Sequence, residues 1–568
     1  MNIYNKSSSQ NGEAHRAFRH FKGLMLAAAM LAVLISFILF NTWVLHIQAR
    51  TVLASLPAGS QQASQTSGSP FTVWVSPSLV RVGPTDAAGT ASSITVSGAR
   101  GETLDTQVIL QAPAGGLTNV NLSASALTGP GGATIPASNL VLYREYYVAV
   151  QGSFNAGGNN PPLGPGTYPE PLIPFVDPET GAALCGNGAP LQACNASVAA
   201  NQNQPFWIDL NMPRGATNVP PGTYTGTITV TSNQGSVTVP VTLTLWNFEL
   251  PLKPSELTHF AFWLNSGGPT NVQQQSLTRN RIIGMNWSAA QAASFQTSDG
   301  LNRSSLGGTF GWNFVSCNGS LNDPIPSQAA IANAAAAYPA GMPLDLYVSD
   351  ETIGCSAAWP NIRTIANNAH GAGVKILDTV PPDSNLYNYV DYWVILPVNW
   401  PGSLAGVPGT FWSYTSCNVG TGSNPRWDID FAPINERLQA GFLNQTQGAT
   451  GLLYYAVDRW SSGNTQGSWD SLNTSACGVP GSADGMMLYP PAPIGSTESA
   501  PGIRLKAIRD GIQDYEYTQI LNNLGQVPFL NSIIVPIATS WTNWTHNPTA
   551  LENARQQLGQ KLQQLSPQ

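Results

Sequence analysis

The pattern of hydrophobic and polar positions changes near residue 250. Before it, short runs rich in Val, Thr, Ile and Tyr are separated by Gly, Pro and Asn, without helical periodicity. This pattern predicts β-strands at residues 71–75, 107–110, 120–123, 141–150, 207–210, 224–231 and 237–245. Such a series within residues 71–250 is typical of an antiparallel β-sandwich, with residues 152–205 as a long Gly-, Pro- and Asn-rich excursion.

After residue 250, apolar runs alternate with segments of helical composition. The runs occupy residues 260–264, 282–287, 309–315, 344–349, 374–379, 392–396, 410–414 and 451–457, and the helical segments occupy residues 327–338, 359–370 and 432–445. Apolar strands that alternate with helices predict a parallel sheet covered on both faces. Eight runs within residues 251–525 predict a (β/α)8 barrel of the TIM type.

Two helices are predicted at the C-terminal end. Residues 503–524 place apolar side chains on one helical face, and their acidic residues stand beside arginines. We expect those acids to form ion pairs on the outer surface of the helix; they are Asp510, Asp514 and Glu516. An Asn-Pro pair at residue 547 is typical of a helix start, and it opens a terminal amphipathic helix within the extension 526–568.

The N-terminal 50 residues carry a targeting signal. Four basic residues precede an apolar run at residues 24–40, which continues less purely to residue 47. The basic flank stays in the cytoplasm, so we expect everything after residue 50 to lie outside it. The run is intermediate in length between a signal-peptide core and a membrane span; we favour an uncleaved anchor over cleavage near residue 54. Residues 51–70 then form a flexible polar linker.

Composition excludes several classes of function. Only 9% of the residues are charged and the net charge is −7, so nucleic acid is excluded as a partner. Neither a GxGxxG after a strand nor a GxxxxGK[ST] motif occurs, and the histidines are isolated in sequence. We therefore expect no nucleotide cofactor, no metal and no Ser-His-Asp triad. Carboxylates among many aromatic residues remain, which is the equipment of enzymes that cleave glycosidic bonds.

The best candidate pair of carboxylates is Asp350 and Glu351. They follow an apolar strand, and barrel active sites are built at the C-terminal ends of strands. Neighbours in an ideal strand point to opposite faces, so both can serve one site only if the chain bends, which Gly354 favours. An ordinary solvated acid pair is the alternative interpretation. The candidate substrate-binding residues at other predicted strand ends are Trp312, Asp378, Trp393, Trp412, Tyr454, Tyr455 and Trp460.

Residues 485–490 (GMMLYP) and 503–517 (IRLKAIRDGIQDYEY) resemble the C-terminal signature of glycoside hydrolase family 123. That family comprises β-N-acetylgalactosaminidases and many uncharacterised relatives. Further stretches resemble its β-sandwich and its barrel strands, among them residues 169–174, 221–226 and 411–415. The resemblance covers roughly residues 71–525.

The resemblance implies a chemistry and places it on the candidate pair. In that family an adjacent Asp-Glu pair acts by a retaining mechanism in which the 2-acetamido group of the substrate is the nucleophile. Glu351 would then be the general acid and base, and Asp350 would hold the acetamido N–H. Many relatives read Asp-Glu-Pro, whereas Thr352 stands here.

Two alternatives remain open at this point. The first is a non-catalytic surface protein that binds glycans. The second is a hydrolase of a glycan without an acetamido group, which needs a separate nucleophile such as Asp378 or Asp458.

Six cysteines, all beyond residue 180 and none with CxxC spacing, suit an oxidising compartment. Cys317 follows the third predicted barrel strand and Cys355 follows Glu351 closely, so both are expected on the same rim. We predict that these two pair, that Cys185 pairs with Cys194, and that Cys417 and Cys477 form the third disulfide.

Overall fold

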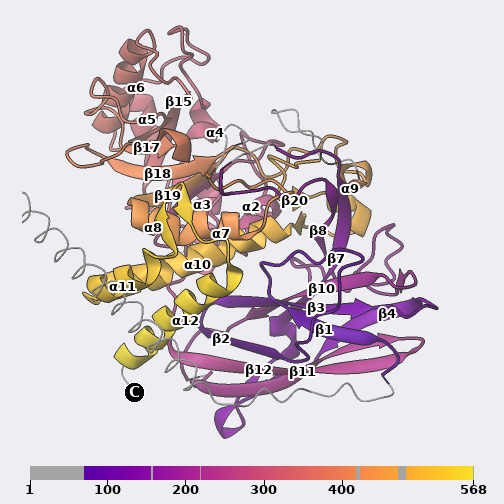
Figure 1. Cartoon of the computed structure of the whole chain (residues 1–568). Helices are drawn as coiled ribbons and strands as arrows, with labels where there is room; N and C mark the ends of the chain where they lie inside the picture. Colours follow the sequence, from indigo (N-terminus) through magenta and orange to yellow (C-terminus); the bar gives the residue numbers. More distant parts are fainter. Residues whose placement is uncertain are drawn as a thin grey trace, which may run out of the picture. The chain divides into compact units, whose positions relative to one another are not determined.

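The computed structural model describes residues 69–154, 158–217, 219–416, 423–470, 472 and 481–566. Two β-sheets of the N-terminal half face each other (Figure 1). One has the order β1-β3-β10-β7-β8, and these strands are Thr72–Ser76, Thr103–Gln111, Asn203–Asn211, Leu140–Val150 and Gly166–Pro174. The other has the order β2-β12-β11-β4-β9, with strands Ile94–Arg100, Gly235–Glu249, Gly222–Ser232, Leu117–Ala124 and Ala196–Val198. The short β5 (Leu127–Thr128) and β6 (Thr134–Ile135) extend it.

The predicted β-sandwich is confirmed, with two differences. Strands β2 and β12 pair in parallel, whereas the other sandwich strands pair antiparallel. Strand β8 lies inside the segment that was predicted to be an excursion. Its sequence contains three prolines, which cannot donate to a ladder, and β8 is accordingly an edge strand. Proline content therefore hid this strand from sequence analysis.

Strand β10 is buried on both faces, by the sandwich core on one side and by helix α10 (Ile503–Asn523) on the other. Phe206, Ile208 and Leu210 point into the sandwich core, as strand alternation requires. Trp207 and Asp209 point the other way and are also buried, because helix α10 packs on that face. The first sheet is thus covered on both sides.

The second half of the chain contains a curled parallel sheet of seven strands in the order β13-β19-β18-β17-β16-β15-β14. The strands are β13 (Leu257–Phe260), β14 (Ser304–Ser305), β15 (Leu344–Asp350), β16 (Lys375–Thr379), β17 (Tyr392–Ile395), β18 (Thr410–Thr415) and β19 (Ala449–Tyr454). The first and last of them in sequence pair with each other, as in a barrel. Among the described residues the sheet has two free edges, β13 and β14, so the predicted closed (β/α)8 barrel is not confirmed.

Backbone conformation explains where the barrel prediction was wrong. Residues 282–287 contribute a single bridge, between Gly284 and Phe260, because Arg281 and Asn286 on either side adopt φ of +58°. Residues 309–315 form no strand, since Gly311 and Asn313 also have positive φ. Extended pairing needs negative φ, so these segments cannot hold a ladder. The short β14 takes the place of the third strand.

Several helices accompany the parallel sheet. They are α2 (Asn271–Thr278), α3 (Ala289–Ser298), α4 (Gly307–Phe310), α5 (Gln328–Ala335), α6 (Trp359–Gly371), α7 (Ile434–Leu438), the π-helical η4 (Gln439–Leu443) and α8 (Asn444–Gln447). The short α9 (Gly467–Asp470) instead contacts Tyr146 of β7 in the β-sandwich. The three predicted helical segments of this half are all helical. After the short pair β20 (Leu488–Tyr489) and β21 (Ala500–Pro501) come α10, α11 (Val527–Ile534), β22 (Ala538–Ser540), β23 (Asn543–Trp544) and α12 (Pro548–Leu565). Asn547 caps α12 as predicted, by accepting from the Thr549 N–H.

Helix α10 is central rather than peripheral. Every residue from Ile503 to Thr518 is buried, so the expected ion pairs on an outer helical surface are wrong in their location. The helix can approach its neighbour closely because Gly511 meets Gly441 of η4, where an added Cβ on Gly511 would lie 2.4 Å from the Arg437 carbonyl oxygen. A larger residue there would push the two helices apart.

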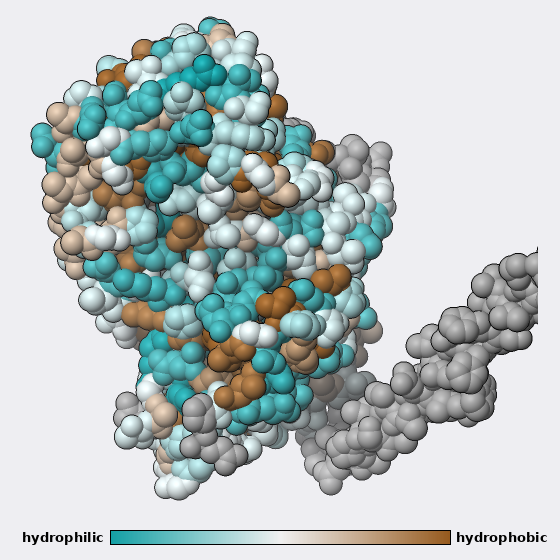
Figure 2. Space-filling view, turned by 90° about the vertical axis from the view of Figure 1, so that its left-hand side faces the viewer, coloured by the Kyte–Doolittle hydropathy of each residue, from teal (hydrophilic) through white to brown (hydrophobic). Residues whose placement is uncertain are grey.

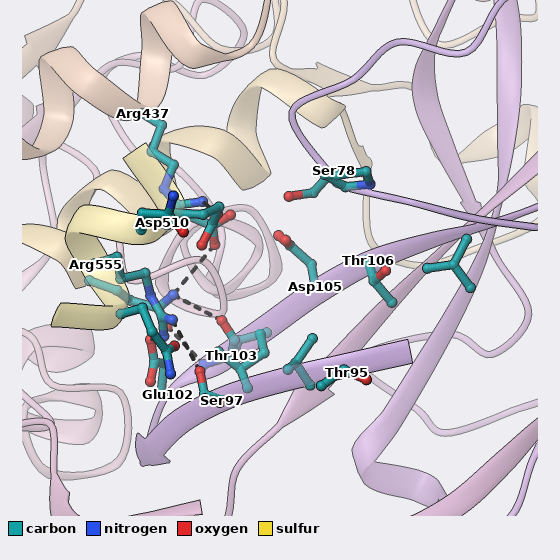
Figure 3. A pocket seen from close by; sticks show the side chains of 18 of the residues that line it. Ser78, Thr95, Ser97, Glu102, Thr103, Asp105, Thr106, Arg437, Asp510 and Arg555 are labelled. Atoms are coloured by element: carbon teal, nitrogen blue, oxygen red, sulfur yellow. Dashed lines mark hydrogen bonds and ion pairs between the residues drawn. The ribbon is translucent and has the colours of Figure 1, made fainter. Parts of the chain in front are cut away.

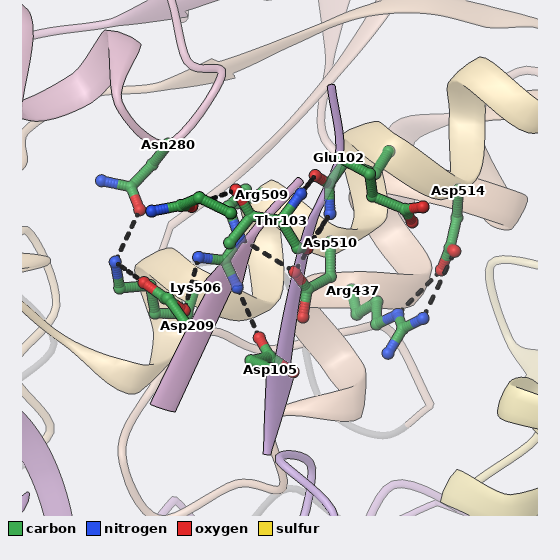
Figure 4. A network of polar contacts seen from close by, with 12 residues as sticks. Glu102, Thr103, Asp105, Asp209, Asn280, Arg437, Lys506, Arg509, Asp510 and Asp514 are labelled. Atoms are coloured by element: carbon green, nitrogen blue, oxygen red, sulfur yellow. Dashed lines mark hydrogen bonds and ion pairs between the residues drawn. The ribbon is translucent and has the colours of Figure 1, made fainter. Parts of the chain in front are cut away.

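Ion pairs join α10 to the β-sandwich (Figure 4). Arg509 pairs with Asp209 at 2.8 Å, with Asp510 at 3.0 Å and with Asp105, while Lys506 pairs with Asp209 at 2.8 Å. We call these five residues the α10 junction. Burial opposes ionisation of Asp209, but Arg509 and Lys506 outweigh it and lower the pKa of Asp209 to about 2. Lys506 also donates to Asn280 at 3.1 Å, which links the junction to the loop after α2.

No helix among the described residues has the length and apolar character needed to cross a membrane. The predicted N-terminal targeting segment, residues 1–50, and the linker that follows lie outside the described residues. Figure 2 shows one face of the molecule, on which hydrophobic residues form small groups among hydrophilic ones.

Candidate active site

The candidate site lies at the C-terminal end of β15, where the pairing of β15 with β16 is irregular. Tyr347 is opposite Leu377 and Asp350 is opposite Thr379, so β15 uses one residue more than β16 over this stretch. This is a β-bulge, and it moves Asp350 onto the same face of the sheet as Tyr347. Without it, strand alternation would place Asp350 on the opposite face.

Glu351 supplies the second part of the bend. Its φ is +52°, a left-handed conformation that is costly for a residue with a side chain and concentrates at functional sites. The bend that the sequence analysis required is therefore made at the bulge and at Glu351, next to the predicted Gly354. Both carboxylates are exposed at the C-terminal edge of the sheet. We call Asp350, Glu351 and the residues that bond to them the β15 rim.

Neutral donors hold Asp350. The hydroxyl of Tyr347 donates to Asp350 Oδ1 at 2.7 Å, and the hydroxyl of Thr379 lies 3.1 Å from the same oxygen. The Asp350 N–H donates to the side chain of Asn313 at 3.1 Å. Burial, with Asp350 as the next cause, raises the pKa of Tyr347 well above its usual value, so this tyrosine remains a donor.

Glu351 is held in the same manner from the far side of the curled sheet. Tyr414 of β18 donates to Glu351 Oε1 at 2.7 Å, and the Glu351 N–H donates to Thr379 at 3.0 Å. Burial and the Glu351 carboxylate raise the pKa of Tyr414 far above its usual value. Among the described residues no Lys, Arg or His forms an ion pair with either carboxylate. The rim therefore presents negative charge that only hydroxyl and amide groups contact.

Beneath the rim a hydrogen-bonded group fixes the loop after β15. Ser349 donates to Asp378 at 2.6 Å, and its hydroxyl lies 2.7 Å from that of Thr352. Thr352 is buried, so the residue that departs from the Asp-Glu-Pro pattern is anchored by a hydrogen bond instead of a ring. Burial and, to a smaller extent, the charge of Asp350 raise the pKa of Asp378 to about 8, although the hydrogen bond from Ser349 opposes this. A neutral Asp378 under the rim adds no charge to it.

A disulfide clasps the same loop. Cys317 and Cys355 are bonded, with Cα atoms 5.1 Å apart, as predicted. Cys185 and Cys194 are also bonded, which confirms the local pair. Cys417 and Cys477 lie outside the described residues.

The interior of the curled sheet below the rim is filled. Arg303 pairs with Asp345, bonds to the Thr258 carbonyl oxygen at 2.8 Å and lies over the ring of Trp412. Burial and then Arg303 lower the pKa of His259 well below its usual value, so this histidine is neutral. Access to the sheet is from the C-terminal edge, where Asp350 and Glu351 stand.

The predicted substrate-binding residues separate into two groups. Trp312 lies beside the pair: its side chain is 40% exposed and it stacks on Tyr347 with ring centroids 5.9 Å apart. Tyr455 and Trp460 are partly buried, and they bond to Asp484 and to the Leu488 carbonyl oxygen respectively.

The other four side chains are buried, so they are not exposed at the β15 rim. They are Asp378, Trp393, Trp412 and Tyr454. Trp393 packs among the helices on the outer face of the sheet, Trp412 fills its interior, and Tyr454 packs against Trp427. A tryptophan or tyrosine in a barrel strand is a core residue unless it stands at the very end of that strand, and sequence alone does not locate that end.

Sequence reasoning missed the residues that hold the pair, namely Tyr347, Tyr414, Thr379 and Asn313. Tyr347 and Tyr414 stand within predicted strands, at positions whose side chains point into the sheet interior. Thr379 ends another predicted strand. Their positions at or near strand ends were the available signal. The sequence does not predict which of these side chains come into contact across the sheet.

A cavity of about 490 Å³ lies elsewhere, between the β-sandwich and helices α10 and α12 (Figure 3). Hydroxyl and charged side chains line it, including Ser78, Thr95 and Asp510. Its two arginines already have ion pairs: Arg437 with Asp514 and Glu552, and Arg555 with Glu102 and Asp514. The lining includes no residue of the parallel sheet, so this cavity is not the candidate active site.

Comparison with known proteins finds two similarities to glycoside hydrolase family 123. A family model for the glycoside hydrolase 123 N-terminal domain matches residues 81–232. The solved structure of a family 123 glycoside hydrolase from Clostridium perfringens, described in terms of glycolipid glycan hydrolysis, is similar with a TM-score of 0.59. The match covers 87% of this chain and 99% of that chain at 13% sequence identity. The resemblance to glycoside hydrolase family 123 is confirmed.

Other matches are weaker. The CooA pilin subunit of enterotoxigenic Escherichia coli matches with a TM-score of 0.16 and 14% identity over 31% of this chain and 97% of that chain. A β-glucuronidase of Bacteroides uniformis matches with a TM-score of 0.25 and 7% identity over 77% of this chain and 51% of that one. Scores this low carry no argument. A search of curated protein sequences finds no match.

The family model matches within the β-sandwich, and the solved structure shows that the overall fold is similar. The matched residues 81–232 do not include Asp350 or Glu351. The roles of these two residues therefore rest on the geometry of the β15 rim. Among the described residues no group of three or more His, Cys, Asp and Glu is placed to hold a metal ion.

Proposed function

We propose that this family 123 relative is an exported hydrolase of β-linked 2-acetamido-2-deoxy sugars, with GalNAc favoured. The proposed mechanism is retaining and substrate-assisted, with Asp350 and Glu351 as the catalytic residues. The observation that carries the proposal is the bend at the β15 rim, which brings two adjacent carboxylates to the open edge of the sheet. An ordinary solvated acid pair would not need a bulge, a left-handed Glu351 and a tyrosine donor for each carboxylate.

The mechanism assigns one task to each carboxylate. Glu351 donates its proton to the glycosidic oxygen as the bond to the anomeric carbon breaks. The acetamido oxygen of the substrate bonds to that carbon and forms an oxazolinium-type ring. Asp350 accepts a hydrogen bond from the acetamido N–H and stabilises the positive charge of the ring. Water then attacks the anomeric carbon and gives a proton to Glu351, while the bond between that carbon and the acetamido oxygen breaks and the ring opens. Two displacements at the same carbon retain its configuration.

The structure argues against a protein nucleophile at the two positions that the sequence offered. Asp378 is buried under Ser349. Asp458 is buried too, and its Oδ1 accepts the N–H groups of Trp263 and Leu264. A carboxylate engaged in this way does not reach an anomeric carbon at the rim. This supports the substrate's own acetamido group as the nucleophile.

Export and the class of partner are part of the same proposal. The two disulfides support an oxidising compartment outside the cytoplasm. The partner is an oligosaccharide or glycan, and the similar Clostridium perfringens enzyme suggests glycolipid glycans as substrates to test. Attachment to the membrane through the N-terminal apolar segment remains an expectation from sequence.

The test is hydrolysis of aryl β-glycosides of GalNAc, GlcNAc and galactose by the purified full-length protein. We expect turnover of the GalNAc glycoside and none of the galactoside, which has no acetamido group. Hydrolysis of the galactoside alone would establish the hydrolase without acetamido assistance. Binding of glycans without turnover of any of the three would favour the non-catalytic alternative.

Two variants separate the roles of the carboxylates. Asp350→Asn should lose about 10²–10³ in kcat on all leaving groups, because it removes charge stabilisation of the intermediate. Glu351→Gln should lose most on substrates with poor leaving groups, which need protonation. Asp391→Asn is the matched control, since Asp391 precedes β17 at the opposite edge and pairs with Lys375 at 2.9 Å. Full activity of Asp350→Asn, or a glycosyl adduct trapped on a protein carboxylate, would exclude substrate assistance.

A further inference from the structure

Tyr414 reaches Glu351 from across the sheet. Two strands, β16 and β17, separate β18 from β15 in the sheet order, and only the curl of the sheet brings Tyr414 and Glu351 together. The Tyr414 hydroxyl nevertheless lies 2.7 Å from Glu351 Oε1. The Tyr414 ring is fixed below, where it packs in the sheet interior with Trp412 and Leu377. The contact is therefore between a rigid donor and an exposed carboxylate.

We infer that Tyr414 is a positioning residue which reserves Glu351 Oε1 as an acceptor and so assigns the catalytic proton to Glu351 Oε2. This inference rests on the proposed role of Glu351 as general acid and base. A tyrosine hydroxyl has one proton, and here it is donated to Oε1. An oxygen that accepts this bond can remain the carbonyl oxygen when the carboxyl group is protonated. The proton then resides on Oε2.

The groups around Tyr414 keep it a donor. Burial, Glu351 and Asp350 all act against ionisation of its hydroxyl. Tyr347 serves Asp350 on the neighbouring strand β15 and has no hydrogen bond to Glu351 among the described residues. Asp378 bonds to Ser349 below the rim, and Thr379 accepts from the Glu351 N–H rather than contacting the carboxylate. Tyr414 is thus the single hydroxyl that contacts the Glu351 carboxylate in the described part of the chain.

The two tyrosines therefore have different expected effects. Tyr347 bonds to a carboxylate that stays ionised through the proposed reaction, so its loss should affect every substrate. Tyr414 bonds to the carboxylate that gains and loses a proton, and a hydrogen bond to the charged form favours that form. Removing the Tyr414 hydroxyl should hold the proton on Glu351 to higher pH and leave its position undefined.

The test compares Tyr414→Phe with Tyr347→Phe and with the control Tyr392→Phe. Tyr392 stacks on Trp412 at 4.9 Å, and no hydrogen bond of its hydroxyl is found among the described residues. For Tyr414→Phe we expect the alkaline limb of kcat/KM to move up by about 0.5–1 pH unit, the size of one hydrogen bond. Its kcat should fall about tenfold on glycosides with poor leaving groups and less than threefold on activated aryl glycosides. Tyr347→Phe should slow both classes equally, and Tyr392→Phe should match the wild type.

A second readout does not depend on activity. Carboxyl ¹³C resonances of Glu-labelled protein are titrated by NMR, and the Glu351 signal is identified by its absence in Glu351→Gln. The titration midpoint of Glu351 should rise by about 0.5–1 pH unit in Tyr414→Phe and stay unchanged in Tyr392→Phe. An unchanged midpoint in Tyr414→Phe would overturn the inference, as would an equal loss of activity on both classes of substrate. If the wild type hydrolyses none of the glycosides, the proposed function fails. The titration by itself then tests whether the Tyr414 hydroxyl affects the protonation of Glu351.

Discussion

The α10 junction and the β15 rim both gather carboxylates, and they hold them in opposite ways. At the junction Asp105, Asp209 and Asp510 are buried or nearly so and all pair with Arg509. At the rim Asp350 and Glu351 are exposed, and within the described part of the chain their hydrogen bonds are with hydroxyl and amide groups. The sequence indicates part of this difference, since Asp510 stands beside arginines in a helix whereas Asp350 and Glu351 follow an apolar strand.

The difference teaches which carboxylates remain available for chemistry. A buried charge must be paired, and once paired its position is fixed and its charge is cancelled. A carboxylate held by neutral donors keeps its negative charge and can accept a proton or face a cationic intermediate. The junction is therefore suited to fixing the sandwich to the second half of the chain, and the rim is suited to catalysis. Three predictions test this contrast.

The largest effect on stability is expected at the junction. Arg509→Met leaves the buried Asp209 carboxylate with Lys506 as its remaining cationic partner among the described residues, which should cost about 3–5 kcal/mol of unfolding free energy. Urea unfolding followed by circular dichroism measures the change. Asp350→Asn is the matched control, because it alters an exposed carboxylate and should change stability by less than about 0.5 kcal/mol. Equal stability of Arg509→Met and the wild type would show that the junction does not hold the two halves together.

The next effect concerns the disulfide at the rim. Replacing Cys317 and Cys355 together with Ser opens a loop of 38 residues, which should cost about 3–4 kcal/mol through the entropy of the unfolded chain. The control replaces Cys185 and Cys194, which close only 9 residues and should cost about 2–3 kcal/mol. Thermal unfolding of both variants under identical conditions measures the ranking. A larger loss from the shorter loop would contradict the entropic account.

The smallest of the three effects depends on pH and concerns Glu145 of β7. Glu145 is buried, and neither of its carboxyl oxygens has a hydrogen-bond partner among the described residues. Burial raises its pKa from 4.5 to about 8, although Arg81 opposes this. The folded protein thus keeps a proton that the unfolded chain has released, and wild-type stability falls as pH rises between these two values.

Glu145→Gln removes that proton linkage. The variant should gain about 2–3 kcal/mol over the wild type on going from pH 5 to pH 7. Chemical unfolding at both pH values measures the gain. A difference between variant and wild type that does not change with pH would show that Glu145 is ionised in the folded protein.

Local features of the chain were predictable because they depend on neighbours in sequence. Alternating Val, Thr and Ile predicted seven of the sandwich strands but missed β2, β8 and β9. Apolar runs predicted the parallel strands β15 to β19 and met β13 only at Phe260, and the Asn-Pro pair at residue 547 predicted the start of α12. The Asp350-Glu351 pair was visible for the same reason, since it directly follows an apolar strand. The Cys185–Cys194 disulfide followed from closeness in sequence, and the Cys317–Cys355 disulfide followed from two loops that were expected on the same rim.

What the sequence could not supply depends on contacts between distant segments. Positive φ at Arg281, Asn286 and Gly311 prevented two predicted strands of the barrel from forming. The edge position of β8 allowed this strand to contain prolines. Burial of α10 on all sides needed the sandwich sheet as a second partner, which no helical periodicity reveals.

The candidate site shows the same division. The sequence by itself determined that two carboxylates stand together at a strand end, because Asp350 and Glu351 are consecutive residues. Only the tertiary structure decided that both face one edge, through a one-residue bulge against β16 and a left-handed Glu351. It also decided that Tyr347 and Tyr414 hold them, since the curl of the sheet brings together side chains from β15 and β18 that are 67 residues apart. Contact between side chains across a curled sheet depends on the curvature of the whole sheet, and no local pattern of residues encodes it.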